Sequence, residues 1–224
     1  MSKLLALQEK IGHTFTNINL LEVAFTHSST GAKHNYERLE FLGDRVLGLA
    51  VSETLYEKFP NEPEGHLAKR LSALVQGSFL AIIAREMQLG QYIIFSDAES
   101  ACGGAENDNI LADVFESMIG ALYLDSDYET CRALIRKLWA DRFDTMKKPP
   151  QHPKTKLQEW AQSKNLPLPR YEIAAQSGPD HAPIFDIKLT IEGFDNITVQ
   201  GPSRQEAEKR VATAFIEKHA KDMT

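Results

Sequence analysis

The chain has 224 residues, of which 42% are hydrophobic, and carries a formal net charge of −6 at pH 7. This length allows one large domain or two small ones, and no apolar run approaches the roughly 18 to 20 residues of a membrane span. The apolar stretch at the N-terminus is too short for a signal peptide, and Cys102 and Cys131 alone cannot build a disulfide framework or a zinc site. We therefore expect a cytoplasmic protein with two reduced thiols and no membrane contact.

The first long helix is predicted over residues 37–59 and ends at Pro60. It places Glu37, Glu40 and Asp44 at positions i, i+3 and i+7, on one helix face. The rest of the segment is largely apolar, so this acidic stripe brings like-charge repulsion and a desolvation cost. A divalent metal ion is the leading candidate to offset both.

A second acidic pair lies further along the chain. Asp113 and Glu116 again stand at i and i+3 within an apolar helix predicted over residues 107–124. Two such helices can meet and supply the oxygen ligands that Mg²⁺ prefers. An alternative is that the carboxylates cap helices or form ion pairs on a solvated face. The candidate cations for such pairs are Arg38, Arg45, Lys69 and Arg70.

Further helices are predicted over residues 66–89 and 128–143, which makes the first part of the chain an all-α domain, residues 1–146. A proline-rich linker follows at 147–153. The remainder, 154–224, changes period and predicts a small α+β domain with the order α-β-β-β-α. Its predicted elements are a helix at 154–164, strands at 170–176, 184–191 and 194–200, and a helix at 203–220 with Ser203 as N-cap.

Several segments of the chain resemble those of a known family. Residues 37–44 are similar to the signature of the ribonuclease III family, and residues 110–125 to the second metal-binding helix of that family. Residues 26–29 and 64–75 resemble two shorter segments of the same enzymes, in the same order. The α-β-β-β-α part looks like the double-stranded RNA-binding domain that follows their catalytic domain.

The resemblance implies an endoribonuclease that hydrolyses phosphodiester bonds of double-stranded RNA with Mg²⁺-activated water, with Mn²⁺ able to substitute. It would leave 5′-phosphate ends and short 3′ overhangs, and would process precursor rRNA, structured mRNA and tRNA. It also implies a homodimer, in which Phe41 inserts into a socket on the partner; a plain core role for Phe41 is the alternative. The implied metal ligands are Glu40, Asp44, Asp113 and Glu116, with Asp44 and Glu116 as the catalytic pair, and Glu37 and Glu64 support the site or contact substrate across the dimer.

In the second domain the resemblance implies RNA contacts by Gln158 in the first helix, by His181 in the first turn, and by Ser203, Arg204 and Lys209 in the last helix. The chain departs from the family pattern at Gln205, where a second basic residue is usual, at Arg45 beside Asp44, and in the acidic segment 105–109. Because one helical step is about 100°, Arg45 need not point at the metals.

Net charge argues against an RNA partner, because RNA binders usually carry a basic face. The excess acid lies in residues 1–149, with net charge −6, whereas residues 150–224 are neutral. Bound metal would neutralise part of it, so we expect modest, salt-sensitive affinity. Two other functions compete with the nuclease: a catalytically inactive double-stranded RNA-binding regulator, and a metal-dependent phosphohydrolase acting on small nucleotides.

Overall fold

The computed structural model describes residues 2–146, 149–150, 152–179 and 183–219. It separates into two compact units, Met1–Pro150 and Gln151–Thr224. The bounds of the expected linker stay a prediction, since residues 147, 148 and 151 lie outside the described part.

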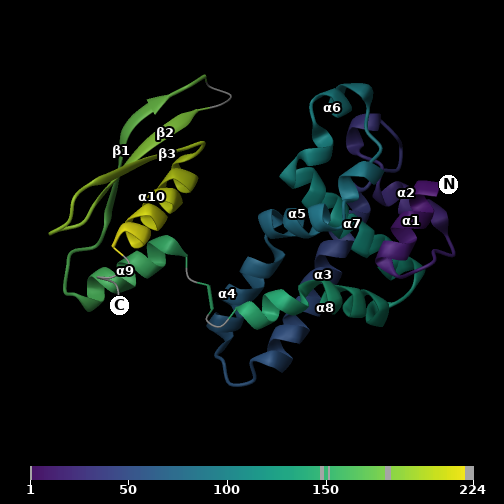
Figure 1. The fold of residues 1–224 in the computed structure, drawn as a ribbon, viewed down its shortest axis with the longest axis horizontal. Helices are drawn as coiled ribbons and strands as arrows, with labels where there is room; N and C mark the ends of the chain where they lie inside the picture. Colours follow the sequence, from purple (N-terminus) through teal and green to yellow (C-terminus); the bar gives the residue numbers. More distant parts are fainter. Residues whose placement is uncertain (1, 147–148, 151, 180–182, 220–224) are drawn as a thin grey trace. The chain divides into compact units, whose positions relative to one another are not determined.

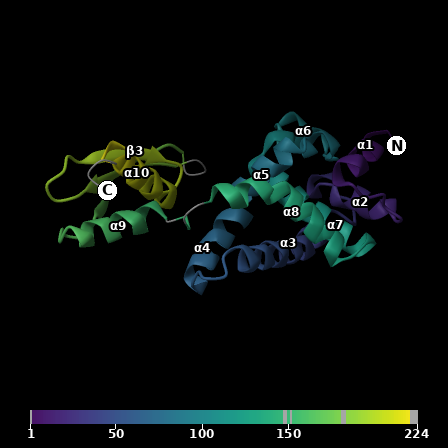
Figure 2. The same cartoon turned by 60° about the horizontal axis from the view of Figure 1, so that its bottom comes forward.

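The first unit is all-helical, as the sequence predicts (Figure 1). The longest helix, α3, packs along α7 at its centre, and Figure 2 shows α8 crossing beside them. Short 3-10 turns occupy Ser28–Thr30, Leu89–Tyr92 and Gly104–Glu106. The helices are α1 (Ser2–Ile11), α2 (Ile18–Ala24), α3 (Glu37–Lys58), α4 (Glu64–Val75), α5 (Gly77–Glu86), α6 (Asp97–Ala101), α7 (Asp108–Asp125) and α8 (Tyr128–Thr145).

The predicted helix over residues 66–89 is wrong as a single element, because the chain bends by 48° between α4 and α5. Gln76 adopts extended backbone angles (φ −69°, ψ 144°) and Gly77 opens the second helix. Glycine is a poor helix former, so a glycine and a serine in succession weaken the helix at that point. Among the described residues no single helix is long and apolar enough to cross a membrane; only this bent pair passes on length and composition.

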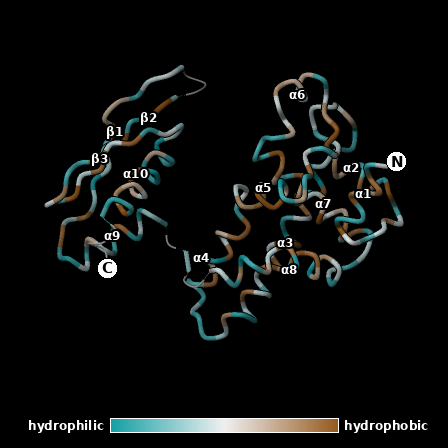
Figure 3. The backbone as a smooth tube through the Cα atoms, viewed as in Figure 1, coloured by the Kyte–Doolittle hydropathy of each residue, from teal (hydrophilic) through white to brown (hydrophobic). Residues whose placement is uncertain are grey.

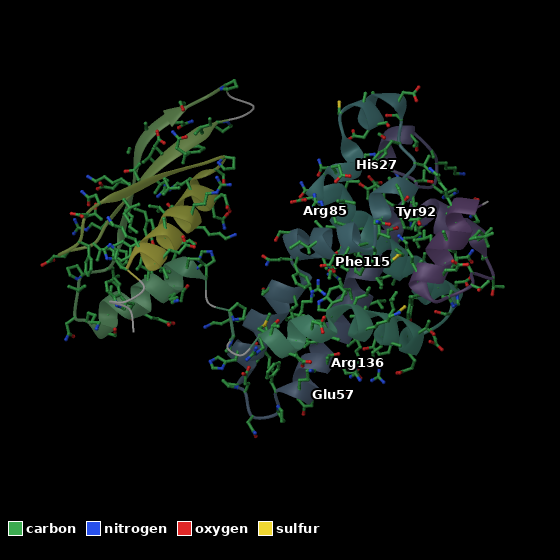
Figure 4. The ribbon with its side chains drawn as sticks, viewed as in Figure 1. His27, Glu57, Arg85, Tyr92, Phe115 and Arg136 are labelled. Carbon is green, nitrogen blue, oxygen red and sulfur yellow. The ribbon has the colours of Figure 1, made fainter. Side chains whose placement is uncertain are left out.

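Charged pairs fasten the outer helices to the apolar core. Arg136 of α8 pairs with Glu57 of α3, and the two side chains point toward each other in Figure 4. A more enclosed pair involves Arg70 of α4, whose side chain is fully buried. Its guanidinium donates to both carboxylate oxygens of Glu62, at 2.8 and 2.6 Å, and lies 3.8 Å from the ring centre of Phe59. A third bond of 2.5 Å reaches the Met146 carbonyl, so Arg70 ties the end of α8 to α4.

Replacing Arg70 by Ala should lower the free energy of unfolding by about 3 kcal/mol, because the packing of the buried side chain is lost and Glu62 is left without its bidentate partner. Arg142→Ala is the matched control, since Arg142 pairs with Glu86 on the surface, and the loss there should stay below about 1 kcal/mol. Urea denaturation of both variants measures the difference. Equal losses would mean that burial of the Arg70 pair adds nothing.

The second unit has the predicted order α-β-β-β-α. Both helices lie on one face of an antiparallel sheet of order β1-β2-β3 (Figure 1). Between the sheet and the helices lies a separate apolar core that includes Leu157, Trp160, Ile187, Val211 and Phe215. Figure 3 shows hydrophobic (brown) and hydrophilic (teal) residues alternating along the helices and strands of this unit. The elements are α9 (Pro153–Ser163), β1 (Arg170–Ser177), β2 (Ile184–Thr190), β3 (Ile197–Gly201) and α10 (Arg204–Lys218), so β3 begins three residues later than predicted.

Candidate metal centre and nucleic-acid interface

Three of the predicted metal ligands meet between α3 and α7. One carboxylate oxygen from each of Glu40, Asp113 and Glu116 lies within 4.8 Å of the other two. All three side chains are half-buried. The i, i+3 spacing in α7 turns Asp113 and Glu116 toward the face of α3 that carries Glu40. The two acidic helices therefore do come together, as the sequence predicts.

Two glycines permit this close approach. A Cβ atom added at Gly43 would overlap the backbone carbonyl oxygen of Glu116, and one added at Gly120 would overlap the carbonyl oxygen of Leu39. The backbones of α3 and α7 thus touch at the level of the carboxylates. Any larger residue at either glycine would separate the two helices.

The electrostatics of this cluster favour a bound cation. Burial raises the pKa of Glu116 to about 8, with further contributions from the charges of Asp44, Glu40 and Asp113. Burial and neighbouring carboxylates likewise raise the pKa of Glu40, and burial raises that of Asp113. Within the described part of the chain, no Lys or Arg forms an ion pair with these three carboxylates (Glu40, Asp113 and Glu116). A half-buried set of carboxylate oxygens fits the ligand preference of Mg²⁺ or Mn²⁺.

The raised pKa of Glu116 predicts a pH dependence of stability in metal-free protein. This carboxyl holds its proton in the folded state up to about pH 8 but releases it near pH 4.5 when unfolded. Its contribution to stability is therefore complete below about pH 4.5 and is lost as pH rises through about 8. With chelator present, the melting temperature of the wild type relative to Glu116→Gln should fall between pH 5 and 8.5, and Mg²⁺ should reverse the fall. A difference that does not change with pH would contradict this.

Asp44 stands at the edge of the cluster. Its charge raises the pKa of Glu116 and of Glu40, which places it nearby, yet it does not belong to the group of three. Its carboxylate pairs instead with Arg45, whose guanidinium lies 5.8 Å from the ring centre of Phe41. The long side chain of Arg45 spans the helical step and reaches Asp44, not the group of three. For Asp44, this is the ion pair on a solvated face that was the alternative to a metal site.

The two supporting carboxylates lie in different places. Glu37 begins α3, one turn before Glu40, and its carboxylate accepts a hydrogen bond from the side-chain amide of Asn35 (3.2 Å). Glu64 begins α4, beyond the far end of α3, and α3 extends about 21 Å past Asp44 at 1.5 Å per residue. Glu64 therefore does not join the cluster of its own chain.

Sequence reasoning gave no role to a buried histidine behind the cluster. His27 is 8% exposed, stacks on Tyr36 with ring centres 5.4 Å apart, and accepts a hydrogen bond at Nδ1 from the Ser29 amide (3.1 Å). Burial raises the pKa of Asp113 in α7 and the charge of His27 opposes this rise, so His27 lies near Asp113. Tyr36 directly precedes α3, and its pKa is raised by burial and then by the charge of Asp113. The only signal in the sequence was the short motif at residues 26–29.

The predicted RNA contacts occupy the exposed side of the second unit. Gln158 lies on the solvent face of α9. Ser203 caps α10 by accepting a hydrogen bond from the Glu206 amide (3.2 Å). Arg204 pairs with Glu208 and Lys209 with Glu206, so both cations already have acidic partners. His181 lies outside the described residues.

Comparisons with known proteins agree with this geometry. Residues 17–142 match the family model described as Ribonuclease-III-like, and residues 153–219 match the double-stranded RNA binding motif. Proteins named Ribonuclease 3 from Caulobacter vibrioides and Ehrlichia ruminantium are 46% and 45% identical over 217 residues. These alignments cover 95% of this chain and 94% and 96% of the relatives. The crystal structure of the nuclease domain of ribonuclease III from Campylobacter jejuni is 40% identical, with a TM-score of 0.61, and covers 64% of this chain and 97% of that one.

Proposed function

This chain belongs to the ribonuclease III family, and we propose that it cuts double-stranded RNA with Mg²⁺ held by Glu40, Asp44, Asp113 and Glu116. It is an endoribonuclease with a C-terminal double-stranded RNA-binding domain. The observation that carries the metal proposal is the group of three half-buried carboxylates between α3 and α7. Mn²⁺ is the expected substitute, because it accepts the same oxygen ligands.

A divalent cation at this site would activate the attacking water and neutralise charge on the scissile phosphate. Glu40, Asp113 and Glu116 would hold that cation with their converging oxygens, and Asp44 would complete the set in place of its pairing with Arg45. Glu37 extends the acidic face toward the substrate. The products we propose are 5′-phosphate ends with short 3′ overhangs, from precursor rRNA, structured mRNA and tRNA in the cytoplasm.

We propose that the enzyme acts as a homodimer, so that each of two sites cuts one strand. Phe41 is 69% exposed on α3, which supports a contact with a partner rather than a core role within one protomer. Leu49 and Tyr56 are also exposed on the same helix, at 57% and 74%. An apolar stripe of this kind on a single protomer fits contact with a second copy. In a dimer, Glu64 would then reach the partner's half of the substrate. For the Campylobacter jejuni nuclease domain, a second structure describes a flexible region involved in dimer formation.

Phe41→Asp should convert the dimer to a monomer, because it places a charge in the proposed socket and removes the aromatic anchor. Sedimentation equilibrium measures the change, and cleavage should fall with it. Ile82→Asp is the control, since Ile82 is 48% exposed on α5, away from this stripe, and should stay dimeric. A wild type that sediments as a monomer, or a Phe41→Asp dimer, would rule out this interface.

The test of function is incubation of the full chain with a labelled RNA hairpin, with Mg²⁺, with Mn²⁺ and with chelator. We expect discrete cuts on both strands that need the metal. A hairpin that is bound but uncut under every condition would make this chain the binding regulator instead. Hydrolysis of free nucleotides with the hairpin left uncut would favour the phosphohydrolase.

A further inference from the structure

Glu208 is a buried carboxylate at the basic start of α10. Its side chain is 10% exposed, and each of its two oxygens accepts from a different cation. Lys154 Nζ donates to Oε2 at 2.5 Å, and Arg204 Nε donates to Oε1 at 2.8 Å. Lys154 lies in the first turn of α9 and Arg204 in the first turn of α10. One carboxylate therefore joins the beginnings of both helices.

Lys154 and Arg204 both bind Glu208, yet both side chains remain partly exposed to solvent. Lys154 Nζ also lies 4.8 Å from the ring centre of Tyr171, and the side chain of Lys154 is 31% exposed. Arg204 uses Nε for Glu208, and its side chain stays 61% exposed. Burial opposes ionisation of Glu208, but hydrogen bonds from Lys154 and Arg204 outweigh it and lower its pKa. The carboxylate is thus a charged, enclosed anchor for two solvent-facing cations.

Glu206, two residues earlier, has the opposite setting. Its side chain is 36% exposed and pairs on the surface with Lys209 (3.7 Å) and Arg210 (3.2 Å). These cations lie one turn further along α10. A phosphate that approaches them must displace Glu206, and the exposed carboxylate repels that phosphate.

We propose that Glu208 is a positioning residue for RNA binding, which holds Lys154 and Arg204 where both contact backbone phosphates, whereas Glu206 competes with phosphate for Lys209 and Arg210. The proposal rests on the proposed RNA-binding role of the second unit. It assigns opposite effects to two acidic residues in one helix. Fixing the cations before binding reduces the side-chain entropy lost on contact.

The test compares Glu208→Gln with Glu206→Gln in the full chain. Binding to a fluorescent double-stranded RNA is followed by anisotropy, with chelator present to prevent cutting and at several salt concentrations. For Glu208→Gln, Kd should rise about fivefold to tenfold, and the slope of log Kd against log salt should fall by about 1 to 2, since up to two phosphate contacts weaken. For Glu206→Gln, Kd should fall about twofold to threefold, because a repulsive charge is removed. Glu217→Gln removes the same charge from the last turn of α10, about 16 Å from Glu206 along the helix axis, and should change Kd little.

Two outcomes would overturn the proposal. If net charge alone matters, Glu208→Gln will bind RNA as tightly as wild type or more tightly. If Glu208 acts only by stabilising the fold, Glu208→Gln will still weaken RNA binding in a variant that already carries Lys154→Gln and Arg204→Gln. The positioning role predicts no further change in that variant. Circular dichroism melting of each variant accompanies the binding curves. A wild type that binds no double-stranded RNA would instead contradict the proposed function.

Discussion

Glu116→Gln should lower the rate of RNA cleavage by at least about a thousandfold, since a metal ligand supports several kcal/mol of transition-state stabilisation. Glu116 is the most strongly perturbed carboxyl of the site, and its pKa of about 8 reflects burial and then the charges of Asp44, Glu40 and Asp113. Because the carboxyl otherwise keeps its proton up to about pH 8, the ionised form needs a cation beside it at neutral pH. The amide keeps the shape of the side chain but removes the negative charge and half of the oxygen donors.

Binding of double-stranded RNA by the same variant should stay close to wild type, because the RNA contacts that we propose lie mainly in the second unit. Single-turnover cleavage and anisotropy in chelator separate the two properties. Glu129→Gln serves as the control, since Glu129 pairs with Arg132 on the surface of α8, and its cleavage rate should be unchanged. Parallel loss of binding and cleavage in Glu116→Gln would indicate a damaged fold rather than a missing ligand.

The acidic cluster was predictable because it depends on the spacing of carboxylates within each helix. Glu40 and Asp44, like Asp113 and Glu116, are spaced so that a helix alone decides which face they share. Charges on that face of an apolar helix already imply a partner. What the spacing does not contain is the order of the ligands in space: Asp44 stands apart because Arg45 reaches back to it, and that depends on the side-chain conformation of an exposed residue.

Other features depend on contacts between distant residues and could not be predicted from local patterns. The break at Gln76 lets α5 turn and pack against α7, whereas the apolar periodicity through residues 66–89 predicts one continuous helix. Arg70 was kept as a possible surface partner for the metal-site carboxylates, yet it is fully buried against Glu62 and Phe59. Glu208 looks like one more solvated charge in the sequence. Its pairing with Lys154 of α9 depends on how two distant segments pack, so a local pattern does not predict it.

Gly43→Ala should lower the free energy of unfolding by about 3 kcal/mol, because the new methyl group meets rigid backbone rather than a side chain that can turn away. The atom it would overlap is the carbonyl oxygen of Glu116 itself. Relief requires α3 to move away from α7, which takes Glu40 away from Asp113 and Glu116. Cleavage should therefore fall even at temperatures where the variant is fully folded, and more Mg²⁺ should be needed for half-maximal rate.

Gly65→Ala gives the matched control for this change. Gly65 is also helical, at the start of α4, but a Cβ atom there would meet nothing within 4 Å. Because glycine disfavours a helix by about 0.5 to 1 kcal/mol relative to alanine, this variant should be as stable as wild type or slightly more stable. Thermal melting and magnesium titration of both variants complete the comparison. If Gly43→Ala kept its stability but needed more Mg²⁺, helix separation would be excluded as the cause. If its stability and its Mg²⁺ requirement both matched wild type, the close contact of α3 and α7 would not be what holds the carboxylates together.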